Sequence, residues 1–517
     1  MVEEFRNEPL TDFSKPDNAR AYEQALAKVE GMLGKDHAAH IGGSDVTAEA
    51  WYESHDPGEL DRLIGRFPRL GVEHVDRAVD VADRYFPTWA ARPAEERAGY
   101  LFEAARLMRE RKHEFSAVMT WEAGKNRVEA DADTAEAIDF LEFYGREALR
   151  YAGKHPITPI PGERNELRYI PLGVGQVIPP WNFPLAILVG MTSAAIVSGN
   201  TVVLKPAKET PLIGHWFASL MREVGLPGGV LQFVTGIGSE IGPRQINHPR
   251  TRFISFTGSM AVGIRLNEEA ARVQDGQIWL KRVVAEMGGK DAIYVDDELH
   301  DMDAAVQGTI AAAFGFSGQK CSACSRLILH DAIHDEFVDR LREAAAKLVV
   351  THPSKAECSF GPVISESAGR KVAEYQGIGR EEGKLLCGGG RVDGNGHYYE
   401  PTIFTGVDSR ARLAQDEIFG PVLAVIRAKD YEDGKRIFND TIYGLTGSIY
   451  SSNEDRLDDA RRTFHVGNLY LNRKCTGALV GGHPFGGFNM SGTDSKAGGR
   501  DYLLLFQQAK SIAEKII

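Results

Sequence analysis

The sequence has few cysteines and no apolar run long enough to cross a membrane. Five cysteines in 517 residues are few and odd in number, which argues against a disulfide framework and predicts a reducing, cytoplasmic environment. The longest apolar stretch, residues 185–199, is shorter than the roughly 20 residues that span a bilayer and contains Thr, Ser and Gly. The N-terminal stretch MVEEFRNEPLTDFSKPDNAR is acidic and has no apolar centre, unlike a targeting peptide. We therefore expect a cytoplasmic protein without a membrane partner.

The chain also lacks an excess of positive charge. Its formal net charge of -12 argues against nucleic acid or an anionic membrane surface as a partner. Hydrophobic residues make up 43% and charged residues 26%, as in ordinary globular proteins, and the length predicts two or three domains. These values favour a small-molecule substrate without identifying it.

The pattern of apolar residues predicts helices first and alternating strands and helices later. Residues 11–150 show mainly helical periodicity, and KHPITPIP (154–161) breaks it with three prolines, which predicts an extended connection or a strand pair. Short apolar runs then alternate with helical stretches, in one block that ends near residue 287 and in another that spans 292–471. This alternation is typical of parallel sheets with helices on both faces. We expect the apolar tail, residues 501–517, to be buried against another subunit.

The stretch GQKCSACSR places Cys321 and Cys324 in a C-x-x-C arrangement. A structural zinc site needs four ligands, but the other cysteines are isolated and no paired histidines follow, so we expect no metal. A thioredoxin-like pair is expected at the start of a helix in a small domain, not deep inside a long chain. The local stretch leaves a single working thiol and two buried, inert thiols as the open interpretations.

A rigid amide, a carboxylate and this thiol stand in separate short motifs. PWNFP holds Asn182 in a turn between prolines, AEMGGK places Glu286 before two glycines, and Cys321 follows in the second block. Together these groups suit acyl chemistry, in which a thiolate attacks a carbonyl, an amide stabilises the oxyanion and a carboxylate activates water. The alternative is that each residue only caps a helix or fills a turn.

Seven motifs occur in a fixed order along most of the chain: PWNFP, LKPA, FTGS, EMGGK, GQKC, EIFGP and PFGGFNMSG. In this order they resemble the aldehyde dehydrogenase superfamily from about Asp80 to the C-terminus. The resemblance implies an α/β fold with two Rossmann-like parallel-sheet domains and a small β element that builds a homo-oligomer. The implied boundaries are residues 1–153 and 174–287 for the NAD-binding domain, 288–471 for the catalytic domain, and 154–173 and 472–517 for the oligomerisation element.

The resemblance also implies roles for individual residues. Cys321 matches the nucleophile, the Asn182 amide and the Cys321 N–H match the oxyanion donors, Glu286 matches the base, and Cys324 has no catalytic role. The implied cofactor is NAD. The residues expected to contact it are Pro179, Trp181, Lys205, Lys208, Gly236, Gly258, Ser259, Glu417 and Phe419. Many NAD-using relatives have glutamate at the position of Lys208, so NADP remains the alternative cofactor.

Longer motifs, among them GFSGQKCSACSR and TGALVGGHPFGGFNMSGTDSKAGG, resemble the branch of the superfamily that oxidises L-glutamate γ-semialdehyde. That aldehyde forms from Δ1-pyrroline-5-carboxylate, and its oxidation to L-glutamate is the second step of proline breakdown. The residues implied to hold the substrate are Ser322, Gly477 and Ala478 at its carboxylate, and Phe183 and Phe485 around its aliphatic part. Glu142 lies either near the pocket mouth or on a solvated helix face. A dehydrogenase for another semialdehyde, such as succinate semialdehyde, and a catalytically silent structural relative remain as alternatives.

Overall fold

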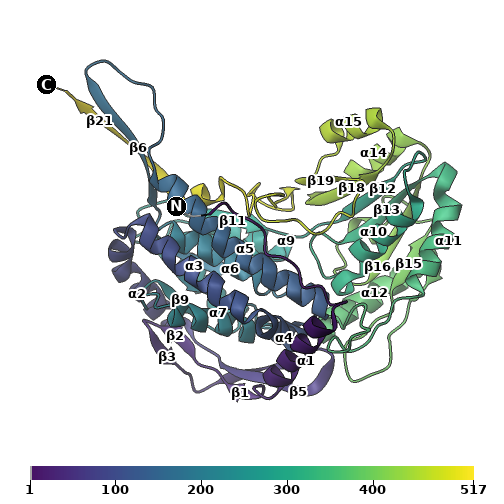
Figure 1. Cartoon of the computed structure of the whole chain (residues 1–517), viewed down its shortest axis with the longest axis horizontal. Coiled ribbons are helices and arrows are strands. Elements are labelled where there is room, and N and C mark those ends of the chain that lie inside the picture. Colours follow the sequence, from purple (N-terminus) through teal and green to yellow (C-terminus); the bar gives the residue numbers. More distant parts are fainter. Residues whose placement is uncertain (1–2, 517) are drawn as a thin grey trace.

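A computed structural model describes residues 3–516, so the predicted domain ends at residues 1 and 517 lie outside the described residues. Within this range the chain forms one large sheet in each of two blocks and a projecting two-stranded arm (Figure 1). Both large sheets are mainly parallel and carry helices, which confirms the predicted α/β class with Rossmann-like sheets.

The first block is built on a sheet with strand order β11-β10-β7-β8-β9-β2-β3. Its strands are β2 (Ala39–Ile41), β3 (Ser44–Val46), β7 (Val174–Ile178), β8 (Thr201–Leu204), β9 (Leu231–Phe233), β10 (Thr251–Thr257) and β11 (Arg282–Glu286). Its helices are α1 (Pro16–Glu30), α2 (Val72–Ala90), α3 (Ala94–Glu110), α4 (Lys112–Ala123), α5 (Arg127–Ala152), α6 (Ala186–Val197), α7 (Pro211–Glu223), α8 (Gly238–Asn247) and α9 (Met260–Ala271). The pairs β10–β7, β7–β8 and β8–β9 are parallel, as the alternating pattern predicted.

The prediction that residues 11–150 are mainly helical is wrong for residues 35–68. This segment contributes β2 and β3 to the large sheet and also forms a separate small sheet. The small sheet contains β1 (Lys35–Asp36), β4 (Trp51–Asp56) and β5 (Glu59–Pro68). The Asp56 carboxylate accepts the Gly58 N–H at 2.8 Å and closes the turn between β4 and β5. Such an Asx turn followed by glycine favours a hairpin over a continued helix.

The longest apolar stretch forms the buried helix α6, which packs against α5. The start of α5 is fixed by Asn126, whose side chain accepts the backbone N–H of Glu129 at 3.0 Å. None of the helices within residues 3–516 combines the length and the apolar character that a membrane crossing requires.

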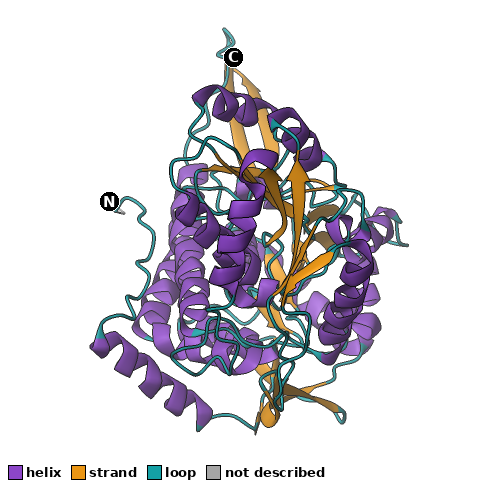
Figure 2. Cartoon of the chain, turned by 90° about the vertical axis from the view of Figure 1, so that its right-hand side faces the viewer, coloured by secondary structure: helices purple, strands orange, loops and turns teal. Residues whose placement is uncertain are grey.

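The second block has the strand order β14-β15-β16-β13-β12-β18-β19. Its strands are β12 (Asp291–Val295), β13 (Cys324–His330), β14 (Lys384–Cys387), β15 (Thr402–Thr405), β16 (Val422–Ala428), β18 (Thr446–Tyr450) and β19 (Asn468–Leu471). Its helices are α10 (Met302–Phe314), α11 (His334–Ala345), α12 (Glu366–Glu382), α13 (Arg412–Gln415), α14 (Tyr431–Asn439) and α15 (Glu454–Thr463). Figure 2 shows helices on both sides of these strands.

The arm consists of β6 (Glu163–Pro171) paired antiparallel with β21 (Gln507–Lys515), and it projects from the first block (Figure 1). Residues 154–161 carry no regular structure, as expected for an extended connection. The apolar tail differs from the prediction: Tyr502, Leu503 and Phe506 are buried in the core of the first block. This part of the tail is therefore covered by its own chain and not by another subunit.

The segment between β19 and the arm touches both blocks. Gly492 forms a β-bridge with Glu286 of the first block, and the Asn468 side chain of the second block donates to the Pro484 carbonyl at 3.0 Å. A short pair, β17 (Tyr443–Gly444) with β20 (Phe488–Asn489), adds a further link. This segment therefore holds the two blocks together beside the carboxyl ends of β10 and β11.

Candidate active site

A cavity of about 110 Å³ lies at the carboxyl ends of β10 and β11, where ligands bind in open parallel sheets. It gathers residues from the first block, the second block and the C-terminal segment. The predicted site residues that line it are Phe183, Glu286, Cys321, Ser322, Gly477, Ala478 and Phe485. These residues are far apart in sequence, and only the folded chain brings them to one cavity.

Cys321 is presented by a tight loop that follows α10. Phe316 and Ser317 have positive φ angles of 51° and 57°, a conformation that costs energy for residues with side chains and is common where a loop is held for function. The Ser317 hydroxyl donates to the Gly361 carbonyl at 2.6 Å and holds this loop in place. Burial raises the pKa of the Cys321 thiol well above its usual value, and the charges of Asp291 and Glu417 add to this effect. The thiol is therefore protonated in the unliganded protein.

Glu286 is the last residue of β11, and its carboxylate is held at both oxygens. The Ser495 hydroxyl donates to Oε1, and the Gly487 backbone N–H donates to Oε2 at 3.2 Å. Burial raises the pKa of Glu286 to about 8, and the two hydrogen bonds oppose this effect because they stabilise the charged form. A carboxylate with a pKa near working pH is suited to take up and release protons.

Asn182 is buried beside the loop that carries Cys321. Its Nδ2 donates to the Gln319 carbonyl at 3.0 Å, which ties the PWNFP turn to the loop. This bond uses one of the two N–H groups of the amide, so the other can serve a second acceptor. Asn182 is not among the residues that line the cavity itself.

Glu136, which the sequence analysis missed, adds a second carboxylate to the cavity. It projects from α5, and burial raises its pKa to about 8. Phe140, one turn further along α5, lines the same cavity. α5 also buries Asp131, Asp133 and Asp139, so the sequence pattern of this helix did not single out Glu136.

Glu142, the residue that the sequence left undecided, lies on the outer face of α5. Its carboxylate accepts hydrogen bonds from Arg109 at 3.1 Å and from Arg146 at 2.7 Å. It is not among the residues that line the cavity, so the solvated helix face is the better description.

Phe183, one of the predicted aromatic pair, packs against a buried cation. The Lys125 ammonium lies 4.1 Å from the centre of the Phe183 ring and 2.8 Å from Asp133 Oδ2. A cation over a ring face in a buried setting restricts the ring's orientation. The wall of the cavity is therefore fixed by charge as well as by packing.

The residues predicted for the cofactor lie near the carboxyl ends of the parallel strands. Lys205 follows β8 and is buried, its Nζ donates to the Pro206 carbonyl at 3.1 Å, and burial lowers its pKa to about 8. An ammonium group has three donors, so hydroxyl groups of a ligand can take the others. Ser259 caps α9, whose first-turn N–H groups suit a phosphate group. Gly258 precedes this cap, and Gly236, with φ of 150°, lies in the turn after β9.

The remaining predicted cofactor residues are Pro179, Trp181, Lys208, Glu417 and Phe419. Glu417 accepts the Gly289 N–H at 3.0 Å, and the Phe419 ring lies edge-on to that of Trp181, with 5.5 Å between centres. Pro179 directly follows β7. The Lys208 side chain is 60% exposed and lies 3.7 Å from the Glu209 carboxylate. These features fit a dinucleotide, with a buried lysine, a helix start capped by Ser259 and aromatic rings beside it.

The second cysteine of the C-x-x-C motif is buried and faces away from the cavity. Its Sγ donates to the Arg326 carbonyl at 3.5 Å, and the cysteines within residues 3–516 are free thiols. Cys475 is also buried and donates to the Ser322 carbonyl at 3.4 Å. The geometry therefore favours Cys321, which lines the cavity, as the working thiol, with Cys324 as a packing residue.

The fold and this cavity define an enzyme class, and comparison with known proteins identifies it. The aldehyde dehydrogenase family profile matches residues 45–512, and the chain belongs to that family. A 1-pyrroline-5-carboxylate dehydrogenase from Geobacillus is 53% identical over 514 residues, which cover 99% of this chain and 100% of the relative. One from Bacillus cereus is 52% identical over 516 residues and covers both chains completely.

A solved structure agrees with these relatives. A 1-pyrroline-5-carboxylate dehydrogenase from Thermus with bound NAD superimposes with a TM-score of 0.98 at 47% identity and covers 99% of each chain. The resemblance that the ordered motifs indicated, to the superfamily and to this branch of it, is confirmed.

Proposed function

We propose that this chain oxidises L-glutamate γ-semialdehyde, the open form of Δ1-pyrroline-5-carboxylate, to L-glutamate with NAD. Full-length relatives at 52–53% identity have this activity in their names, and the Thermus structure has NAD bound. The observation that carries the proposal is that Cys321, Glu286, Gly477 and Ala478 line one cavity. The reaction is the second step of proline breakdown.

In the proposed mechanism the thiolate of Cys321 adds to the aldehyde carbon. The free N–H of Asn182 and the backbone N–H of Cys321 donate to the oxyanion, and one such donor is typically worth about 3 kcal/mol of barrier. Bound NAD would supply the hydride acceptor for this adduct. The thioester left on Cys321 is then hydrolysed by water that Glu286 deprotonates, and L-glutamate leaves.

The raised pKa values of Cys321 and Glu286 are consistent with the order of these steps. Burial and nearby carboxylates keep the thiol of Cys321 protonated in the empty site. A positively charged group bound beside it favours the thiolate, because an opposite charge lowers the pKa of an acid. Glu286, with a pKa of about 8, is ionised in about half of the molecules at pH 8 and in about a tenth at pH 7. The thiol therefore needs a cation beside it to become the nucleophile, and the amount of ionised base for the second half of the reaction rises with pH.

The residues named above would hold NAD. Lys205 would bind the ribose hydroxyls of the adenosine, Ser259 and the start of α9 would bind the pyrophosphate, and Glu417 and Phe419 would hold the nicotinamide ribose and ring. The exposed ammonium of Lys208 supports some use of NADP, since a second cation near the ribose attracts a 2′-phosphate.

The substrate is a zwitterion, and the cavity offers a partner for each charge. The N–H groups of Gly477 and Ala478 and the Ser322 hydroxyl bind the α-carboxylate, and the positive φ of Gly477, 82°, lets the backbone turn toward it. Glu136 binds the α-ammonium, which favours the charged form of its carboxyl group. A substrate without these charges, such as propanal, has neither contact.

We also propose that the protein is a cytoplasmic homo-oligomer. Its cysteines within residues 3–516 are free thiols, which supports a reducing compartment. The β6–β21 arm is mostly exposed and projects from the body, so a second copy of the chain can cover it. We propose that residues 1–153 and 174–287 bind NAD, that 288–471 carry the nucleophile, and that the oligomer contact lies in 154–173 and 472–517.

The test is a comparison of aldehydes and cofactors by NADH or NADPH absorbance. The proposal expects kcat/KM for Δ1-pyrroline-5-carboxylate with NAD to exceed that for succinate semialdehyde and for propanal by tenfold or more. Comparable values for succinate semialdehyde would favour a different semialdehyde dehydrogenase. A protein that binds NAD but oxidises none of them would be a silent relative.

A further inference from the structure

The N-terminal segment, residues 3–12, runs along the outside of the first block before α1 begins. It forms neither helix nor strand, and in Figure 1 it crosses α5 as the darkest part of the ribbon. The family profile starts only at residue 45, whereas the Geobacillus and Bacillus relatives align over 99–100% of this chain. The segment therefore belongs to this branch and not to the shared family core.

Two carboxylates of α5 hold the segment. Asp139 accepts the Glu8 backbone N–H at 2.6 Å and the Asn7 Nδ2 at 2.8 Å. Asp131, about two turns earlier on α5, accepts the backbone N–H of Thr11 at 2.8 Å. Both carboxylates are buried beneath the segment, so these hydrogen bonds are largely shielded from water.

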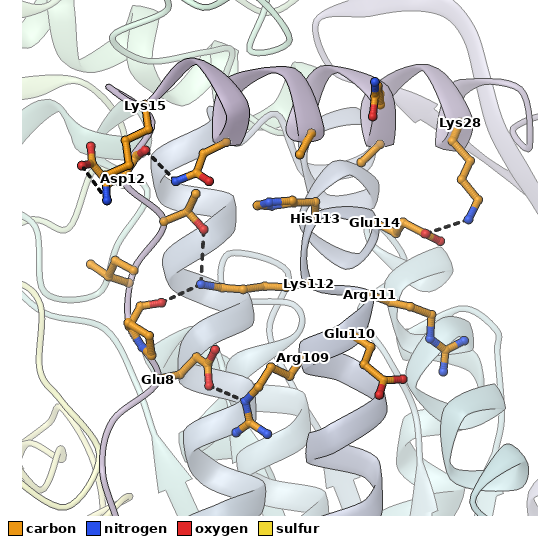
Figure 3. Close-up of a pocket in the computed structure, with 17 residues that line it drawn as sticks. Glu8, Asp12, Lys15, Lys28, Arg109, Glu110, Arg111, Lys112, His113 and Glu114 are labelled. Carbon is orange, nitrogen blue, oxygen red and sulfur yellow. Dashed lines mark hydrogen bonds and ion pairs between the residues drawn. The ribbon is translucent and has the colours of Figure 1, made fainter.

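The opposite side of the segment is held by the junction of α3 and α4. Figure 3 shows Glu8 facing Arg109, which donates to it at 2.7 Å, and Lys112 reaching the segment. The Lys112 ammonium donates to the Pro9 carbonyl at 2.8 Å. Arg109 and Lys112 thus contact Glu8 and Pro9 on the side away from α5, so the segment is fixed on both sides.

The segment also reaches the loop that carries the proposed substrate anchor. Asn7 Nδ2 donates to the Val480 carbonyl at 3.0 Å, two residues beyond Ala478. The Phe5 ring packs edge-on against Phe143 of α5, with 5.2 Å between centres. A Cβ at Gly481 would lie 3.1 Å from both rings, so the loop passes closely between the segment and α5.

Asn7 thus joins the two elements that carry the proposed partners of the two charged substrate groups. Its two N–H groups are divided between Asp139 of α5 and the Val480 carbonyl of the loop. The same helix carries Glu136, three residues before Asp139, and the same loop carries Ala478. The two hydrogen bonds of Asn7 therefore help to set the distance between Glu136, the proposed partner of the α-ammonium, and Ala478, a proposed partner of the α-carboxylate.

We propose that Asn7 is a positioning residue for substrate selectivity. It fixes the Gly477–Ala478 loop relative to α5, so that both charged groups of an α-amino-acid semialdehyde are bound at once. This proposal rests on the proposed function. Asn7 does not touch the substrate, and its effect appears in KM for the zwitterionic aldehyde and not in the chemistry at Cys321.

The test replaces Asn7 by aspartate, which has the same shape, donates neither hydrogen bond and places a second carboxylate beside Asp139. The repulsion between the two carboxylates should lower the melting temperature. Loss of the Val480 contact should raise KM for glutamate semialdehyde about 3- to 10-fold, the range for one ordinary hydrogen bond, while KM for propanal and kcat stay within twofold. The matched control is Asn18→Asp, an exposed asparagine that donates to the Asp12 carbonyl at 2.9 Å and has no contact with the loop. It should match the wild type with both aldehydes.

A double variant separates positioning from stability. Asn7→Asp combined with Asp139→Asn restores a donor–acceptor pair between segment and helix but leaves the Val480 carbonyl without its donor. We expect the melting temperature to recover and KM for glutamate semialdehyde to stay raised. Recovery of KM, or equal effects of Asn7→Asp on both aldehydes, would overturn the proposal. A wild type that does not prefer glutamate semialdehyde to propanal would overturn the proposed function as well.

Discussion

Replacing Ser495 by alanine should slow acyl-enzyme hydrolysis most at low pH and least at high pH. The Ser495 hydroxyl donates to Glu286 Oε1, and this bond stabilises the charged carboxylate against the burial that raises its pKa to about 8. Since the base is the ionised form, activity rises with pH through the pKa of Glu286. Without the hydroxyl the carboxyl group holds its proton to higher pH.

The size of the effect follows from the strength of this bond. A hydrogen bond to a charged group is worth about 1.5–3 kcal/mol. At pH 8, where about half of Glu286 is ionised, its loss should lower the ionised fraction by roughly 7- to 80-fold. The difference between variant and wild type should narrow as the pH rises further, because both carboxyl groups then ionise.

Ester hydrolysis measures this step without the cofactor. p-Nitrophenyl acetate acylates Cys321 in a burst, and the steady rate that follows reports hydrolysis of the acyl-enzyme. The control is Ser491→Ala, a buried serine of the same segment whose hydroxyl accepts the Gly444 N–H at 3.0 Å and is not hydrogen-bonded to Glu286. A loss in Ser495→Ala that is constant with pH would refute the reasoning, because it would mean that the serine only orients the carboxylate.

Three further changes test other parts of the site. Cys321→Ala should abolish both dehydrogenase and esterase turnover while NAD still quenches protein fluorescence; substantial residual activity would contradict its role as nucleophile. Glu136→Gln should raise KM for glutamate semialdehyde about 10-fold or more and leave propanal unaffected, because a charged partner of the ammonium is lost; equal effects on both aldehydes would argue against it. Lys208→Glu should increase the ratio of kcat/KM with NAD to that with NADP by about tenfold, since the carboxylate repels a 2′-phosphate; an unchanged ratio would show that Lys208 does not contact the ribose.

The chemistry of the site could be predicted from short motifs because each one specifies its own local geometry. Pro180 and Pro184 restrict the turn around Asn182. Short continuous apolar runs located β7, β8, β9 and β10, because strands of a parallel sheet are buried on both faces. The hairpin of β4 and β5 was missed because it stands among long helices and its strands are rich in charged residues and only partly buried. Such strands show no clear apolar pattern.

What the sequence determined by itself is the set of reacting groups and the class of fold, since a thiol, a carboxylate and an amide keep their chemistry wherever they lie. Only the tertiary structure decided which partners adjust that chemistry. Glu286 meets Ser495, 209 residues later in the chain, and Asn7 meets Val480, 473 residues later. Such contacts depend on how the blocks pack and leave no local pattern, so the pKa of the base and the link across the substrate site could be found only in the folded protein.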